Sequence, residues 1–457
     1  MSLIKSLWVM LALGSLGFTS AQATPALDAS CKLRYPIVLS HHWSARAICS
    51  ERAAATGPAS CVQTEDYAKY CTQKIQDTQG QPTCAEWRVP ASEEDLPPRN
   101  TNRVDGSLHR DVRSYHRYFS KAIVDRLRDT CGNAVYIADK PAFASYEVRA
   151  RSLRNTVNEA LAREHADKVI LIGLSQGVQD ARYMTAKLLV DDHNPALGTL
   201  NTKVAALVGL AGEDGGAESA SLALDFLSLS LGGHWANYQQ AIAMIGDQTV
   251  NDTSWKRTTD GGDTYVLGEQ CRGAECNLDT EGRYKSALHS LFDLSPQYMR
   301  PTLAQQGASA TAKWQQLMDY LGIEQARWAD VVPPELEANN GVDYFSYGAK
   351  INNWLPAWGG TFTQDFLFFA GITLSSGAND GYVSVKRQQY ANTAANFHHV
   401  KTLDGTLWGR GYHHMYFSGR NDKLYAPQPW DQEAAPYKGP AADFYHQVAR
   451  DLKVRGF

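Results

Sequence analysis

A serine lies in a glycine-bounded turn, Gly-Leu-Ser-Gln-Gly, at residues 173–177. The apolar run at 169–172 before it predicts a buried strand, and the apolar residues after it, from Val178 to Leu188 and Leu189, have helical spacing. Such a turn strains the serine backbone, so only glycine at its two ends leaves room for the strand and the helix to pass. We therefore expect Ser175 to stand clear of a sheet edge as a nucleophile.

A serine hydroxyl needs an imidazole to take its proton and a carboxylate to hold that imidazole. After a turn of this kind the acid, and then the histidine, follow the serine along the chain. Asp380, in an Asn-Asp-Gly turn, is the first candidate for the acid, and Asp404 is its rival. The pair His413 and His414, in a glycine-rich loop, comes before the histidines at 398, 399 and 446 as the base. Singly these are ordinary turn and surface residues, but together, in this order, they predict a triad.

The charge that builds on a substrate oxygen during acyl transfer must be met by backbone N–H donors. One donor normally belongs to the residue after the serine, here Gln176, and the other to the loop after an early strand. The apolar run at 35–40 ends in His-His-Trp. Trp43 is therefore the candidate for the second donor. The alternative interpretation is that Trp43 only packs in the hydrophobic core.

Strands and helices alternate around these residues, as a parallel sheet requires. Further strands are expected at 133–138, 203–210, 342–347 and 399–403, and helices at 114–128, 148–165 and 443–452. The first of these helices is expected to bury one face, made of Tyr115, Tyr118, Phe119, Ala122, Ile123 and Leu127. The predicted fold class is α/β, with a mostly parallel central sheet flanked by helices.

Two segments do not fit the alternation. Residues 49–110 are rich in Pro, Ser, Thr and Asn and hold four cysteines, which is typical of a disulfide-held insertion of surface loops. Residues 217–340 are amphipathic, helical and interrupted, without a clear buried strand. We expect this second segment to form a helical cap over the site.

The start of the chain, residues 1–23, has one lysine, an apolar core and a small-residue cleavage site, which is typical of a secretory signal peptide. Its apolar run is too short to favour a membrane span. We expect residues 24–457 to form one secreted domain, extracellular or periplasmic. The net charge of −4 gives no reason to expect a nucleic-acid partner.

The mature part contains eight cysteines, which an oxidising compartment would convert to disulfides. They are residues 31, 49, 61, 71, 84, 131, 271 and 276. Proximity in the sequence suggests only the pair Cys271 and Cys276, and a zinc site is disfavoured because no Cys-x-x-Cys pair exists.

Over most of its mature length the chain resembles the secreted true lipases of bacteria, the Pseudomonas and Burkholderia lipase family of the α/β-hydrolase superfamily. The likeness lies, in matching order and spacing, at residues 35–41, 169–183, 204–216, 340–347, 378–383 and 412–415. It implies Ser175 as nucleophile, Asp380 as acid and His414 as base, since the family's catalytic histidine precedes a leucine-like residue, here Met415. Trp43 and Gln176 fall at the oxyanion positions.

The chain also departs from that family. His42 stands in place of a glycine in the first loop, and Leu174 and Val178 replace the family's histidine and second glycine around the turn. The resemblance implies a structural calcium held by an aspartate two residues after the catalytic histidine and another upstream of the acid. Asp365 could be the upstream ligand, but the later position is Tyr416, whose phenol cannot replace a carboxylate on a hard cation. We therefore expect no calcium at that site and no cofactor.

The leading hypothesis is a secreted serine carboxylic-ester hydrolase, a lipase or esterase, that acts on lipid-like esters through an acyl-enzyme intermediate. Contact with a lipid interface and a lipase-specific chaperone would accompany it. The same triad also suits an acyl thioesterase, a polyester depolymerase or an acyltransferase. A non-catalytic secreted binding protein on a hydrolase fold is the remaining alternative.

Overall fold

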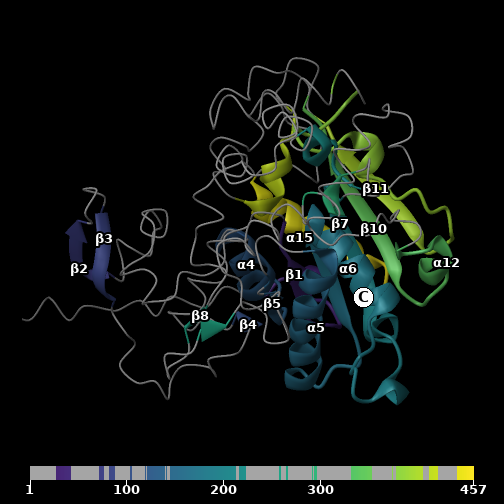
Figure 1. Ribbon diagram of the computed structural model, residues 1–457, viewed down its shortest axis with the longest axis horizontal. Coiled ribbons are helices and arrows are strands. Elements are labelled where there is room, and N and C mark those ends of the chain that lie inside the picture. The colour runs from purple at the N-terminus through teal and green to yellow at the C-terminus, as the bar shows by residue number, and fades with distance from the viewer. Residues whose placement is uncertain are drawn as a thin grey trace, which may run out of the picture.

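Seven strands form one sheet in the order β11-β10-β7-β6-β1-β5-β4 (Figure 1). The computed structural model describes residues 27–42, 71–76, 82–87, 103–104, 119, 121–138, 140, 145–212, 216–222, 257–258, 264–265, 291, 293–295, 331–351, 373, 377–404, 411–419 and 440–457. The six parallel strands are β1 (Ile37–Ser40), β5 (Val135–Ile137), β6 (Val169–Leu174), β7 (Val204–Leu210), β10 (Asp343–Ala349) and β11 (Phe397–Leu403). The edge strand β4 (Arg103–Val104) runs antiparallel to β5.

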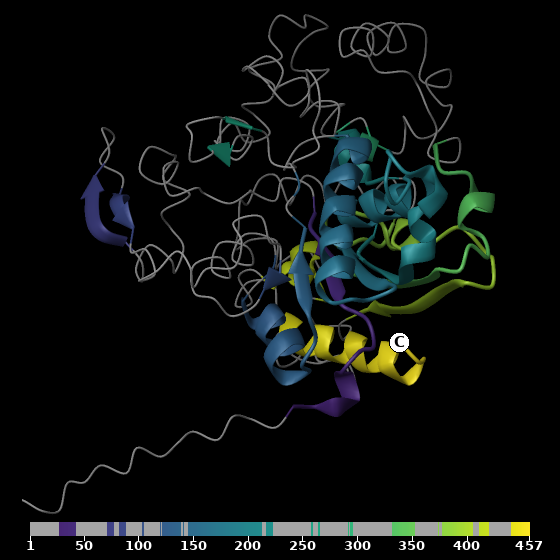
Figure 2. The same ribbon diagram turned by 90° about the horizontal axis from the view of Figure 1, so that it is seen from below.

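Helices cover both faces of the sheet, which is why its central strands are apolar along their whole length. The helices α5 (Tyr146–Arg163) and α6 (Gln176–Lys187) pack on one face, and α4 (Lys121–Asp125) and α15 (Ala441–Val454) on the other (Figure 2). Successive side chains of β1 alternate between these layers: Ile37 and Leu39 join the α4/α15 side, and Val38 the α5/α6 side. The expected α/β fold class is thus confirmed.

The first predicted helix differs from the expectation, because only part of it is an α-helix. It begins at Lys121, passes into a π-helix, η4 (Arg126–Thr130), and residues 114–118 lie outside the described residues. Phe119, Ile123 and Leu127 are buried as expected, but Ala122 is exposed, so its predicted place on the buried face is wrong. Alanine has little apolar area to bury, so its position in an apolar pattern is weak evidence that it faces the core.

The helix after Ser175 also ends earlier than its apolar spacing indicates. Its last residue is Lys187; Leu188 is already extended, and Leu189 forms an isolated bridge with Thr199. Leu188 is still buried, because it packs against the α5/α6 side of the sheet from outside the helix. Burial there does not require helical backbone.

The segment 49–110 contains strands, so the expectation of surface loops alone is wrong. The strands β2 (Cys71–Gln76) and β3 (Pro82–Trp87) form an antiparallel pair, and β4 extends the central sheet. Edge strands and isolated hairpins need no apolar residues on both faces, so their polar composition hides them in the sequence.

Most of the expected cap, 217–340, lies outside the described residues. Within it the structure describes residues 217–222, a short antiparallel pair of β8 (Arg257–Thr258) and β9 (Thr264–Tyr265), residues 291 and 293–295, and residues 331–340, which include α12 (Pro334–Glu337). The cap therefore stays a prediction. The predicted signal peptide, 1–23, is also outside the described residues. Among the helices that are described, none combines the length and the apolar character that crossing a membrane demands.

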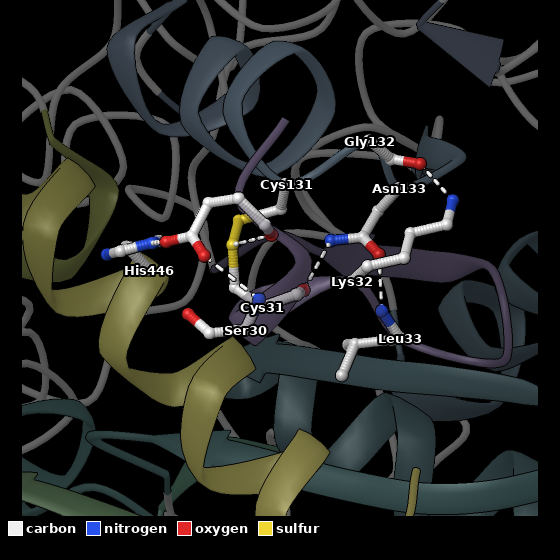
Figure 3. The surroundings of a disulfide bond; sticks show 9 residues. Ser30, Cys31, Lys32, Leu33, Cys131, Gly132, Asn133 and His446 are labelled. Atoms are coloured by element: carbon white, nitrogen blue, oxygen red, sulfur yellow. Dashed lines mark hydrogen bonds and ion pairs between the residues drawn. A yellow bond between two sulfur atoms is a disulfide. The ribbon is translucent and has the colours of Figure 1, made fainter. Parts of the chain in front are cut away.

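A disulfide between Cys31 and Cys131 ties the segment before β1 to the turn before β5 (Figure 3). Asn133 reinforces this join, because its side chain accepts a hydrogen bond from the Leu33 N–H at 2.8 Å and donates one to the Cys31 carbonyl at 3.1 Å. Nothing in the sequence pattern predicts this pair, because its members are 100 residues apart. The pair Cys271 and Cys276 lies outside the described residues.

Candidate active site

The strand, turn and helix predicted around Ser175 are present. Ser175 lies between β6 and α6 with φ 55° and ψ −126°, a conformation that costs free energy for a residue other than glycine. A Cβ atom on Gly173 would lie 2.8 Å from the Gly177 carbonyl oxygen, and one on Gly177 would lie 2.2 Å from the Ser40 carbonyl oxygen. Glycine is therefore required at both ends of the turn, and Ser175 stands at the carboxyl end of its strand.

Asp380 and His414 lie in direct contact. The distance between His414 Nδ1 and Asp380 Oδ2 is 2.7 Å, and both side chains are buried. The other carboxylate oxygen accepts hydrogen bonds from the backbone N–H groups of Tyr382, at 3.0 Å, and Val383, at 2.8 Å. Because a carboxylate only accepts, this contact places the neutral ring's proton on Nδ1 and leaves Nε2 to act as a base.

The loops that carry the acid and the histidine are attached to the end of β10. The Ile351 N–H donates to the Asn379 carbonyl at 2.9 Å, and the Tyr412 N–H donates to the Lys350 carbonyl at 2.8 Å. In register, Leu174 pairs with Leu210, which pairs with Tyr347 of β10. Ser175, Asp380 and His414 thus all belong to the carboxyl edge of the parallel strands, the edge where α/β sheets bind ligands.

The rival candidates have other partners. Asp404 pairs with Lys350 at 2.9 Å and is 41% exposed. His399 Nδ1 lies 2.9 Å from the Ser346 hydroxyl, and His446 Nε2 lies 2.9 Å from an oxygen of Asp28. His413 is buried with its ring against Gly381 and edge-on to Tyr382. The geometry favours Asp380 and His414 over these alternatives.

Only one of the two predicted oxyanion residues can be placed. Gln176 is the first residue of α6, where backbone N–H groups have no partner within the helix. Its side-chain amide is fully buried, with no hydrogen-bond partner among the described residues. Trp43 lies outside the described residues, but the chain that leads to it passes through Ser40 and His41, whose carbonyls lie close to Gly177.

The residues at the later calcium position do not fit a calcium site. Tyr416, in the 3-10 helix η12 (His414–Ser418), is fully buried and packs edge-on against Tyr412, Phe417 and Phe444. An aromatic core offers no hard oxygen ligands. The other expected ligand, Asp365, lies outside the described residues.

Sequence reasoning missed a group of wholly buried charges beneath the end of β1, made of Lys140, Arg149 and Asp180. Asp180 Oδ2 accepts from Lys140 Nζ at 2.6 Å and from Arg149 Nε at 2.9 Å. Burial lowers the pKa of Lys140 to about 7, against the opposing effect of Asp180. A signal was available for Arg149, because it lies four residues before Leu153 and so on the buried face of α5.

The histidine at the end of β1 is held neutral by the same surroundings. Burial, with the charges of Lys140 and Arg149, lowers the pKa of His41 well below its usual range. Its Nδ1 lies 2.9 Å from the His42 carbonyl oxygen, so that nitrogen carries the proton and donates. His41 therefore helps to set the conformation of this loop and is not a competing cation.

No protein-family model and no curated protein matches the chain. Solved structures that it resembles include Staphylococcus hyicus lipase, with 13% identity over 94% of this chain and 97% of that one and a TM-score of 0.43. Lipase 1 from Pelosinus fermentans has 12% identity over 92% and 98%, with a TM-score of 0.42. The metagenomic carboxyl esterase MGS0156 has 11% identity over 97% and 82%, with a TM-score of 0.40.

These proteins are bacterial lipases and esterases of types other than the Pseudomonas and Burkholderia lipases, and the identities and TM-scores are too low to assign an activity or a family. The fold is assigned from the arrangement of its own strands and helices. Six parallel strands, helices on both faces and a strained serine turn at the carboxyl edge make this an α/β-hydrolase fold.

Proposed function

We propose that the chain is a secreted serine carboxylic-ester hydrolase, a lipase or esterase, acting through Ser175, His414 and Asp380. The observation that carries the proposal is the buried contact of 2.7 Å between His414 and Asp380, at the sheet edge where the strained turn presents Ser175. A buried carboxylate that orients a histidine beside a serine turn is the arrangement that activates a hydroxyl nucleophile.

In the proposed reaction, Ser175 Oγ attacks the ester carbonyl carbon while His414 Nε2 takes the hydroxyl proton. Asp380 stabilises the imidazolium that forms. The N–H groups of Gln176 and Trp43 would stabilise the oxyanion of the tetrahedral intermediate. Collapse breaks the ester C–O bond, the alcohol leaves with the proton from His414, and an acyl-enzyme remains. Water then gives up a proton to His414, attacks the acyl carbon and releases the acid, restoring Ser175.

The proposed substrates are lipid-like esters, on the expectation that the amphipathic segment 217–340 forms a helical cap over the site. Contact with a lipid interface and assistance from a lipase-specific chaperone belong to the same proposal. The predicted signal peptide supports export, and the Cys31–Cys131 disulfide fits an oxidising compartment.

The test is hydrolysis of p-nitrophenyl butyrate and p-nitrophenyl palmitate by the purified wild type and by Ser175→Ala. We expect turnover by the wild type and loss of about six orders of magnitude in kcat in the variant. Labelling with a fluorophosphonate should modify Ser175 in the wild type alone. Full activity in Ser175→Ala would rule out the mechanism. Absence of labelling and of turnover in the wild type would favour a binding protein, and a preference for thioester or polyester substrates would revise the substrate class.

A further inference from the structure

The buried ammonium group of Lys140 donates both to the end of β1 and to Asp180. Lys140 Nζ donates to the Ser40 hydroxyl oxygen at 2.6 Å, to the His41 carbonyl at 3.1 Å and to Asp180 at 2.6 Å. An ammonium group has three N–H donors, and here each has one acceptor. Charges this deeply buried are costly unless they are paired, so the arrangement specifies one position for the strand end.

The contacts continue from Lys140 into the turn that carries the nucleophile. The Ser40 hydroxyl, which accepts from Lys140, donates in turn to the Gly177 carbonyl at 2.9 Å. Asp180, the partner of Lys140, is itself a residue of α6, one turn beyond Gly177. Lys140 therefore connects the end of β1 to the nucleophile helix at two places, through Ser40 and through Asp180.

The two elements joined in this way each lead to a predicted oxyanion donor. Gln176 begins α6, and the chain runs from Ser40 through His41 and His42 to Trp43. Arg149 adds hydrogen bonds to the carbonyls of His41, at 2.9 Å, and His42, at 3.3 Å. Donors to an oxyanion are effective only when their positions are fixed before the charge develops.

We propose that Lys140 and Asp180 are positioning residues that hold the end of β1 against the nucleophile helix, and thereby fix the start of that helix, where the Gln176 N–H is the proposed oxyanion donor. This inference rests on the proposed function. It predicts that the pair acts on the transition state more than on substrate binding, because a misplaced donor weakens only the interaction with developing charge.

The test compares Lys140→Met with a matched control, Arg182→Met. Arg182, on α6, is likewise buried and pairs with a buried carboxylate, that of Glu337 in α12, at 2.7 and 2.8 Å. Each substitution removes a buried positive charge from a buried carboxylate, that of Asp180 or that of Glu337, so both should lower thermal stability. Activity is measured with p-nitrophenyl butyrate and expressed per active site, counted by the end point of fluorophosphonate labelling.

For Lys140→Met we expect kcat per labelled site to fall about 10²-fold, the effect of misplacing reacting groups by about 1 Å, with KM changed less than about threefold. The affinity for a phenylboronic acid, which mimics the tetrahedral intermediate, should fall in parallel with kcat. Arg182→Met should keep the wild-type kcat per site. Asp180→Asn retains an oxygen acceptor and should lose less kcat than Asp180→Leu.

Wild-type kcat and boronate affinity in Lys140→Met would overturn the inference, and so would an equal loss of kcat in Arg182→Met. If Lys140→Met does not fold, Ser40→Ala replaces it, since it removes the hydroxyl between Lys140 and Gly177 without leaving a wholly unpaired charge. Unchanged kcat in that variant would also overturn the inference. The proposed function is tested separately, because it fails only if Ser175→Ala stays active or the wild type is inactive.

Discussion

Replacing Asp380 by asparagine should disable the base while leaving the fold in place. Asp380 Oδ1 accepts two backbone N–H groups, those of Tyr382 and Val383, and Oδ2 faces His414 Nδ1 at 2.7 Å. An asparagine has a single side-chain oxygen, and the two N–H groups require it at the Oδ1 position. Its NH₂ group must then face His414, so Nδ1 has to accept and the ring proton moves to Nε2.

A histidine that carries its proton on Nε2 cannot take one from Ser175. For an orienting aspartate of this kind, the wrong tautomer lowers kcat by about 10⁴-fold, which corresponds to about 5.4 kcal/mol of transition-state stabilisation. Asparagine at position 380 keeps the bonds from the two backbone N–H groups and keeps the bond to His414 with donor and acceptor reversed. The free energy of unfolding should therefore change by less than about 1 kcal/mol, the typical net value of one hydrogen bond.

The assay is kcat for p-nitrophenyl butyrate at neutral pH, with unfolding followed in urea on the same preparations. Asp404→Asn is the control, because Asp404 was the rival acid and lies half exposed beside Lys350. It should keep the wild-type kcat. An Asp380→Asn enzyme within tenfold of the wild type would refute the role of this carboxylate, and a large loss in Asp404→Asn would move the role to that residue.

Three further variants test the serine turn, the disulfide and a buried carboxyl group, that of Asp293. In Gly177→Ala the new Cβ would lie 2.2 Å from the Ser40 carbonyl oxygen, so we expect a loss of about 1–3 kcal/mol in urea unfolding together with reduced kcat, and wild-type values for both would show that the turn tolerates a side chain. Cys31→Ser combined with Cys131→Ser opens a loop of 100 residues and should lower the free energy of unfolding by about 2–5 kcal/mol; no change in the unfolding midpoint would contradict the disulfide. Burial raises the pKa of Asp293 well above its ordinary value of 3.8, so the folded protein keeps a proton that the unfolded chain releases, and the wild type loses stability as the pH rises above about 4. Asp293→Asn lacks this titration and should gain stability relative to the wild type between pH 4 and pH 7, whereas an equal difference at the two pH values would contradict the raised pKa.

The sequence was most informative where burial is complete. The strands at 169–174 and 204–210 are apolar along their length because helices cover both faces of the sheet, and their boundaries were predicted within two residues. Glycine was also predictable at 173 and 177, because a Cβ atom at either position would clash with backbone atoms in this turn. Local pattern and final structure agree in these places because one physical cause produces both.

Elements defined by distant partners could not be predicted in the same way. The strand β4 is two residues long and exists because it pairs with β5. Asp380 and Asp404 are both in glycine-flanked turns, and only the contact with His414 separates them. Lys140 belongs to no pattern in its own neighbourhood, since its acceptors come from residues 100 positions earlier and 40 positions later.

The position of β1 in the sheet has a consequence for how the chain reaches this fold. Of the strands that the structure describes it is synthesised first, yet it lies between β5 and β6, so neither of its edges has a partner until those strands follow. At ordinary rates of translation, about 5–20 residues per second, Leu174 follows Ser40 by roughly 7 to 27 seconds. During that interval an apolar ribbon with two open edges is available to any other nascent chain, which is the structural setting in which crowding and slow synthesis favour aggregation over assembly of the sheet.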